Sequence, residues 1–132
     1  MKYRLLLLCL LFVVAFAILS QPSQVTAAQS ATADQDNPVK PTPESLAKAK
    51  KLYGYDCAMC HGETGDGKGD LASDFKNKPR DYTDPASLKE FTDAQLFTII
   101  KDGKGDMPPE GKRAKPDDLW GLVNYIRTLS KK

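Results

Sequence analysis

Histidine is nearly missing from this chain of 132 residues, which has one histidine, three cysteines and three methionines. A single histidine excludes every site that takes two histidines from one subunit. An excess of one charge is missing too, because 19 basic residues stand against 17 acidic ones. Two of the basic residues, Lys2 and Arg4, belong to the extreme N-terminus. A chain so close to neutral is not expected to bind nucleic acid, which calls for a basic excess.

Apolar residues are also scarce once one segment is set aside. The chain is 41% apolar, but an unbroken apolar run covers residues 5–19. The remainder is lean for a small domain, which already struggles to bury enough surface. A chain of this kind usually needs disulfides, a metal or a cofactor to complete its core.

The N-terminus has the pattern of a secretory signal. Lys2 and Arg4 precede the apolar run, and Val25-Thr26-Ala27 offers a small-residue cleavage site. The run is shorter than the roughly 20 residues that a membrane-spanning helix needs, although an uncleaved anchor stays open. We therefore expect residues 1–27 to be a signal peptide. The mature protein is expected to be soluble in a bacterial periplasm, with membrane contact only if this segment is retained.

The segment that follows is polar and contains several prolines. Between residues 20 and 43 only Val25 and Val39 are strong hydrophobes. Such a stretch cannot offset the entropy lost on ordering, so we expect residues 28–43 to form a disordered linker. The folded domain is predicted at residues 44–132.

The rest of the chain has the apolar periodicity of helices and nowhere the alternation of a strand. The first helix is predicted to begin with Thr42 as N-cap and Pro43 in the first turn, and to fade at Gly54. The second opens at Thr92, whose side chain is expected to form a capping box with Gln95.

A third helix is predicted from about Pro116 to Ser130, and a shorter one from Pro85 to Glu90. Between the first helix and Asp81 lies a polar segment with glycine at positions 62, 65, 67 and 69. A loop that long inside a small domain usually wraps around something. We therefore expect an all-α domain with three main helices, short helices and a long glycine-rich loop.

Cysteine chemistry is concentrated in Cys57-Ala58-Met59-Cys60-His61. At this spacing Cys57 and Cys60 can each add to one vinyl group of a haem, and His61 then lies under the iron as proximal ligand. A thioredoxin-like dithiol would need surrounding strands, and a zinc site would need a fourth ligand. A plain disulfide would require neither the histidine nor the glycine-rich loop. Covalent haem c is therefore favoured, and it would also supply the missing core.

The distal iron ligand is inferred by elimination. The chain has no second histidine, and Met59 lies between the two cysteines, where it cannot reach the far face of the haem. Met107 is therefore the predicted distal ligand, in a loop stiffened by Pro108 and Pro109. The alternatives are a methionine that fills a gap in the core, together with lysine ligation or an open iron site. A thioether ligand favours Fe(II) and raises the reduction potential relative to bis-histidine ligation.

These residues resemble the class I c-type cytochromes, small monohaem proteins found alone and as domains of respiratory complexes. The resemblance covers about residues 44 to 132 and also rests on Lys78–Tyr82, Thr92–Leu96, Ile100–Gly103, Met107–Pro109 and Leu119–Arg127. It implies an all-α, cytochrome c-like fold wrapped around one haem. It further implies that the first and last helices cross at a close contact, with Ala49 and Tyr53 facing Leu122 and Tyr125.

The resemblance also implies contacts around the haem. In this family a proline carbonyl accepts the other ring N–H of the haem histidine, and Pro79 is the expected acceptor, with an ordinary turn proline as the alternative. Arg80, Tyr82 and Trp120 are expected to contact the haem propionates or pack on the ring. For Tyr82 and Trp120, plain core packing is an equal alternative.

A haem with both axial positions filled has no open site for a substrate, and no other catalytic set is present. We therefore expect a one-electron carrier or electron-transfer subunit rather than an enzyme, with iron cycling between Fe(III) and Fe(II). Its partners would be redox proteins such as a membrane oxidase, reductase or dehydrogenase. One alternative is a haem enzyme or gas sensor in which Met107 leaves the iron, and another is a thiol oxidoreductase without haem.

Charges around the Met107 loop are mixed and indicate no one-sided docking face. Such a run is usually a solvated surface. The basic residues are offset by five acidic ones, Asp102, Asp106, Glu110, Asp117 and Asp118.

Overall fold

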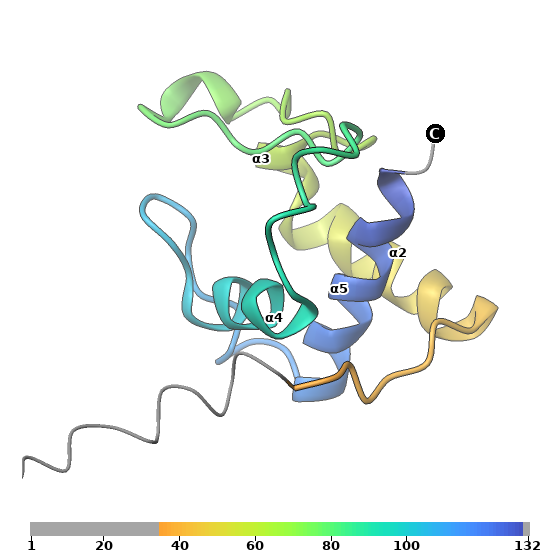
Figure 1. Ribbon diagram of the computed structural model, residues 1–132. Coiled ribbons are helices and arrows are strands. Elements are labelled where there is room, and N and C mark those ends of the chain that lie inside the picture. Colours follow the sequence, from red (N-terminus) through yellow and green to blue (C-terminus); the bar gives the residue numbers. More distant parts are fainter. Residues whose placement is uncertain (1–34, 131–132) are drawn as a thin grey trace, which may run out of the picture.

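The computed structural model describes residues 35–130, and the predicted signal peptide at residues 1–27 lies outside this part of the chain. The described residues form four α-helices and one 3-10 helix, and no strand: α2 (Pro43–Asp56), α3 (Ala58–His61), η1 (Ala72–Asp74), α4 (Asp93–Asp102) and α5 (Pro116–Leu129). Figure 1 shows α3 at one end of the molecule and α4 near the other, with α5 to one side, next to α2. The all-α prediction is confirmed.

Two of the helices begin with capping boxes. Thr42 accepts a hydrogen bond from the Ser45 backbone N–H at 3.2 Å, and the Ser45 hydroxyl accepts one from the Thr42 N–H at 2.9 Å. At α4 the Thr92 side chain accepts from the Gln95 N–H at 3.2 Å, and the Gln95 side chain accepts from the Thr92 N–H at 2.9 Å. Each box satisfies N–H groups that the first turn of a helix leaves unpaired. Both predicted helix starts are confirmed.

The first helix is longer than predicted, because α2 continues through Gly54 to Asp56. Glycine lowers helix stability but does not stop a helix whose hydrogen bonds continue beyond it. Here the Cys57 N–H donates to the Tyr53 carbonyl at 2.9 Å and completes the last turn. The extra turn brings the helix up to the first cysteine of the motif.

The helix predicted at residues 85–90 is wrong, since this segment is a run of turns. Its hydrogen bonds span three residues, as from the Ser87 N–H to the Asp84 carbonyl at 3.0 Å. Arg127 of α5 holds the end of this segment, since its guanidinium donates to the Leu88 carbonyl at 2.8 Å and to the Phe91 carbonyl.

The end of the predicted linker lies against α5. The Asn37 side chain donates to the Trp120 carbonyl at 3.2 Å and to the Asn124 side chain at 3.0 Å. Asn124 in turn donates to the Val39 carbonyl at 2.7 Å. Figure 1 shows this segment passing beneath the start of α5. These hydrogen bonds order the end of the segment. The disordered linker was predicted from the scarcity of hydrophobic residues, which gives no information on such bonds.

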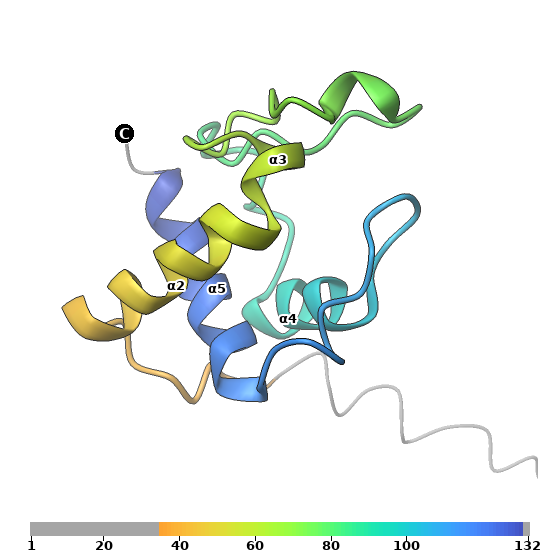
Figure 2. The ribbon, with the colours of Figure 1, turned by 180° about the vertical axis from the view of Figure 1, so that it is seen from behind.

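The close contact between the first and last helices is confirmed at α2 and α5, which cross in Figure 2. The rings of Tyr53 and Tyr125 lie 5.2 Å apart between centroids, at 59° to each other. A Cβ atom placed on Gly121 would lie 3.7 Å from the Ala49 Cβ. Ala49 thus meets Gly121 at the crossing, one residue before the expected Leu122.

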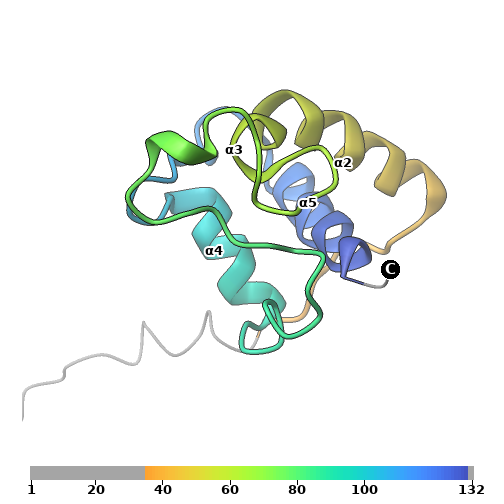
Figure 3. The same cartoon turned by 90° about the horizontal axis from the view of Figure 1, so that it is seen from above.

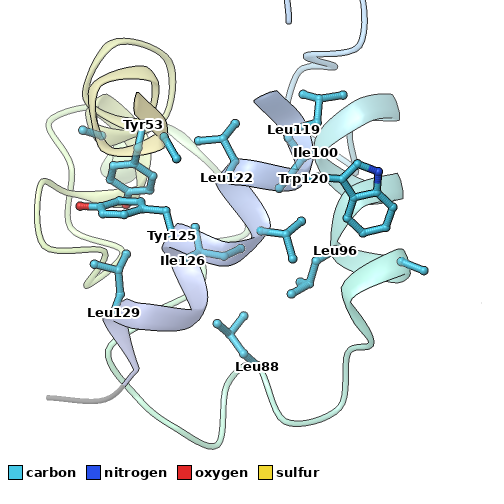
Figure 4. Close-up of a cluster of buried hydrophobic side chains, with 14 residues drawn as sticks. Tyr53, Leu88, Leu96, Ile100, Leu119, Trp120, Leu122, Tyr125, Ile126 and Leu129 are labelled. Carbon is cyan, nitrogen blue, oxygen red and sulfur yellow. The ribbon is translucent and has the colours of Figure 1, made fainter. Parts of the chain in front are cut away.

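The core extends along α5 on both sides of this crossing. In Figure 4 Tyr53, Tyr125 and Leu129 lie on the side toward α2, and Leu96, Ile100 and Trp120 lie on the side toward α4. Leu88, from the run of turns, closes the cluster below. One helix therefore carries most of the packing that holds α2 and α4 in place.

Replacing Gly121 by alanine is expected to stabilise the protein. The added methyl would meet Ala49 at an ordinary contact distance of 3.7 Å, and alanine favours a helix interior over glycine by roughly 0.8–1 kcal/mol. The measurement is urea unfolding of the haem-loaded protein, followed by far-ultraviolet circular dichroism. A loss of stability in Gly121→Ala would show that the crossing is tighter than described.

Candidate haem site

Cys57, Cys60 and His61 lie on a single turn where α2 meets α3. The His61 N–H donates to the Cys57 carbonyl at 2.8 Å, so the motif is closed by its own backbone. Residues three and four apart on a helical turn share a face, and both cysteines can therefore reach one ligand. Both are free thiols, and Cys57 packs against the hydrophobic core.

The glycine-rich segment folds back over the end of α3, as Figure 3 shows from above. Three of its N–H groups donate to successive carbonyls of α3: Gly67 to His61 at 2.8 Å, Gly69 to Cys60 at 3.2 Å, and Leu71 to Met59 at 2.9 Å. These are carbonyls that a helix end otherwise leaves unpaired. The glycines are required because the backbones approach so closely. A Cβ on Gly69 would collide with the carbonyl oxygens of Met59 and Ala58.

His61 is held beside Tyr82. The two rings stack with centroids 4.7 Å apart and planes 16° apart, and the Tyr82 hydroxyl lies 3.3 Å from His61 Nε2. The other ring nitrogen, Nδ1, is buried and has no hydrogen-bond partner among the described residues. Burial lowers the pKa of His61, and a polar contact with the Arg80 backbone offsets part of that effect. The imidazole is therefore neutral near pH 7, which is the form that binds a metal.

The two thiols are protonated at neutral pH. Burial, and after it the carboxylates of Glu110 and Asp56, raise the pKa of Cys57 to about 12. Burial and then Asp74 raise the pKa of Cys60. Redox-active cysteines have lowered pKa values, so the alternative of a thiol oxidoreductase is disfavoured. Within residues 35–130 no three His, Cys, Asp or Glu side chains gather as metal ligands.

These features fit a covalent haem. Two free thiols lie on one turn with a buried imidazole, whose Nδ1 makes no hydrogen bond to a side chain within the described residues. The imidazole is kept neutral by burial, and the turn that carries it is fixed by the glycine-rich segment.

Met107 lies in the loop between α4 and α5, partly buried against the core. Reciprocal backbone hydrogen bonds of 3.1 Å join Lys104 and Met107 and close the tip of the loop. In Figures 1 and 2 this loop projects from the helices on the same side as η1. The structure thus presents Met107 on a braced loop, and its role as an iron ligand stays a prediction.

The other predicted haem contacts lie at three different places. The Pro79 carbonyl packs against Gly67, where a Cβ atom would lie only 2.5 Å from its oxygen. Arg80 donates to the Ser87 carbonyl at 2.7 Å. Trp120 is buried and stacks on Phe97 at 4.2 Å between centroids, which favours the alternative of core packing. Haem roles for Pro79, Arg80 and Trp120 also stay predictions.

Sequence reasoning missed Glu110, which it grouped with a solvated run of charges. The residue is buried, only 4% exposed, and it pairs with Arg113. The available signal was the spacing of three residues between a carboxylate and an arginine just after the Met107 loop.

Replacing Gly69 by alanine is expected to disturb α3 and lower the yield of haem-loaded protein. The new methyl meets backbone oxygens, which cannot move aside as a flexible side chain would. Forcing atoms into a packed site costs about 1–3 kcal/mol. The yield is measured from haem absorbance per unit of protein.

Gly54→Ala is the matched control, because no atom lies within 4 Å of its Cβ position. It should keep the wild-type haem yield. Equal yields for both variants would contradict the proposed bracing of α3.

The sequence is similar to that of known proteins. Residues 44–126 match the family model of cytochrome c oxidase, cbb3-type, subunit III. The cbb3-type cytochrome c oxidase subunit FixP of Azorhizobium caulinodans is 32% identical over 83 residues, 62% of this chain and 26% of that protein. The match thus spans about a quarter of the relative's length.

A solved structure is similar as well. A chain of the reducing HAO-like protein complex of Kuenenia stuttgartiensis superposes with a TM-score of 0.63 and 28% identity, over 72% of this chain and 49% of its own. The fold, the motif and the match over residues 44–126 agree. This chain belongs to the family of cytochrome c oxidase, cbb3-type, subunit III, and it contains a class I c-type cytochrome domain that binds haem c.

Proposed function

We propose that this protein is an exported one-electron carrier, or the electron-transfer part of a larger assembly, with a His/Met-ligated haem. In this proposal Cys57 and Cys60 attach the haem, and His61 and Met107 bind its iron. The observation that carries the proposal is the single turn on which two free thiols lie beside a buried, neutral imidazole. The haem supplies the one-electron chemistry, by cycling its iron between Fe(III) and Fe(II).

The protein's own contribution is rigidity. Backbone hydrogen bonds from Gly67 and Gly69 fix the turn that carries His61, and the stacked ring of Tyr82 limits rotation of the imidazole. An electron carrier benefits from a site that moves little when its charge changes. The hydrogen bonds on α3 support this role better than they would support a site that must open for a substrate.

Rigidity also supports Met107 as the distal ligand. The reciprocal hydrogen bonds between Lys104 and Met107 hold the loop tip, and Pro108 and Pro109 restrict the chain that follows. Gly103, at a φ of +79°, ends α4 and turns the backbone into this loop.

The proposed partners are redox proteins, with a membrane oxidase first among them. The relative from Azorhizobium caulinodans is named as a subunit of a cbb3-type cytochrome c oxidase. Within residues 35–130 no helix has the length and hydrophobicity to cross a membrane. Export is proposed on the signal pattern of residues 1–27.

Met107→Ala is expected to keep the covalent haem but lose the far-red charge-transfer band of methionine-ligated Fe(III). The reduction potential should fall by on the order of 0.1 V or more, since axial ligands set haem potentials over about 0.8 V. The ferrous variant should bind CO, whereas the wild type should not. Absorbance spectra and spectroelectrochemistry measure all three properties.

Met107→His is the companion variant. It should give a bis-histidine spectrum and a low potential. Wild-type spectra in both variants would exclude Met107 as a ligand. CO binding by the wild type would instead favour the alternative in which Met107 leaves the iron.

The intact mass of the purified haem-loaded protein tests the proposed export. Cleavage after Ala27 predicts the mass of residues 28–132 plus one haem, in the soluble periplasmic fraction. A mass that includes Met1 to Ala27, found in the membrane fraction, would refute the soluble form. In that case the linker would tether the haem domain to the membrane.

A further inference from the structure

We infer that Glu110, Arg113 and Asp56 form a clasp that holds the Met107 loop against the cysteine end of α2 and places a buried negative charge near the haem. Glu110 is thus a positioning residue for the distal ligand. The inference deepens the proposed function and rests on it, because the position of the loop matters for electron transfer only if Met107 binds the iron.

Glu110 is enclosed in a way that carboxylates seldom are. It is 4% exposed, and charged side chains are almost never buried unless they are paired. Arg113 supplies the pairing, since its Nε donates to Oε2 at 3.0 Å and its Nη2 donates to Oε1. Two such bonds from one guanidinium fix both the position and the orientation of the carboxylate.

The clasp reaches from the methionine loop to the cysteine motif. Arg113 Nη2 also lies 3.5 Å from the carboxylate of Asp56, the last residue of α2 and the neighbour of Cys57. Glu110 follows Met107 by three positions in the chain. Its backbone N–H donates to the Ile100 carbonyl at 3.0 Å, so the loop is tied to α4 as well.

Stability alone is a weak reason for this arrangement. A buried ion pair often stabilises a protein no better than hydrophobic residues of the same size would. What a charged network adds is a defined geometry between the groups that it joins, together with a local field. Here it joins the two segments that are proposed to bring ligands to opposite faces of one haem.

The charge of Glu110 is linked to the cysteine turn, because Arg113 joins its carboxylate to Asp56, the chain neighbour of Cys57. The clasp contains two carboxylates and one guanidinium, and its net charge is therefore negative. A negative charge near the iron stabilises Fe(III) over Fe(II) and lowers the reduction potential.

The test uses the full haem-loaded protein and two variants that change the net charge of the clasp in opposite directions. Glu110→Gln keeps the size of the side chain and removes its negative charge, so the potential should rise. Arg113→Gln removes the positive charge, so the potential should fall. A general loosening of the fold would move both variants the same way, which distinguishes it from this charge effect.

Asp102→Asn is the matched control, because it makes the same charge change at a side chain that is 56% exposed at the end of α4. Solvent should screen it, and its shift should be the smallest of the three. Potentials are measured by spectroelectrochemistry.

A second readout follows the position of the loop. Imidazole is titrated into the ferric proteins until the far-red band is lost. Arg113→Gln should lose the band at roughly tenfold lower imidazole than the wild type, the scale set by one charge-assisted hydrogen bond. Should Glu110→Gln not accumulate, Asp56→Asn tests the other end of the clasp and should give a smaller rise in potential.

The inference is overturned if the variants shift the potential in the same direction or by no more than Asp102→Asn does. It is also overturned if imidazole displaces the ligand equally in the wild type and Arg113→Gln. Failure of the proposed function has a different signature, since the wild type itself would then lack the covalent haem or the far-red band.

Discussion

A helix of four residues cannot hold its own shape, because fixing the first turn costs more than its few hydrogen bonds return. Yet α3 is such a helix, and it carries Cys60 and His61. Its geometry is set from outside, by the last turn of α2 on one side and by the N–H groups of Gly67, Gly69 and Leu71 on the other. The position of the motif depends on this backbone contact, and only glycine permits so close an approach at position 69.

Packing along α5 sets the positions of α2 and α4, the two helices that lead into the haem-binding segments. On one side α5 meets α2 through Gly121 and Tyr125, which fixes the helix that leads into Cys57. On its other side Trp120 stacks on Phe97 of α4, the helix that leads into the Met107 loop. Arg127 adds hydrogen bonds to the segment just before α4. The two chain segments proposed to carry the axial ligands thus share one supporting helix.

Local signals predicted much of this from the sequence. Capping residues such as Thr42 and Thr92 act within a few positions, so both helix starts were predictable, and the cysteine motif is local as well. Much of what composition and periodicity missed depends on partners distant in sequence. Arg127 binds the Leu88 carbonyl in the run of turns, and Asn124 binds the Val39 carbonyl. Glu110 is a separate case, because its partner Arg113 lies only three residues away. The roles of Pro79 and Arg80 concern the haem itself and stay predictions.

Peptide mapping of the purified protein determines whether Cys57 and Cys60 attach the haem. Trypsin cleaves after Lys51 and Lys68, so residues 52–68 form one fragment that contains both cysteines and His61. This fragment is expected to carry one haem, bound through two thioether bonds that survive acid extraction. Recovery of the same fragment with two free thiols, or with a disulfide between them, would contradict it.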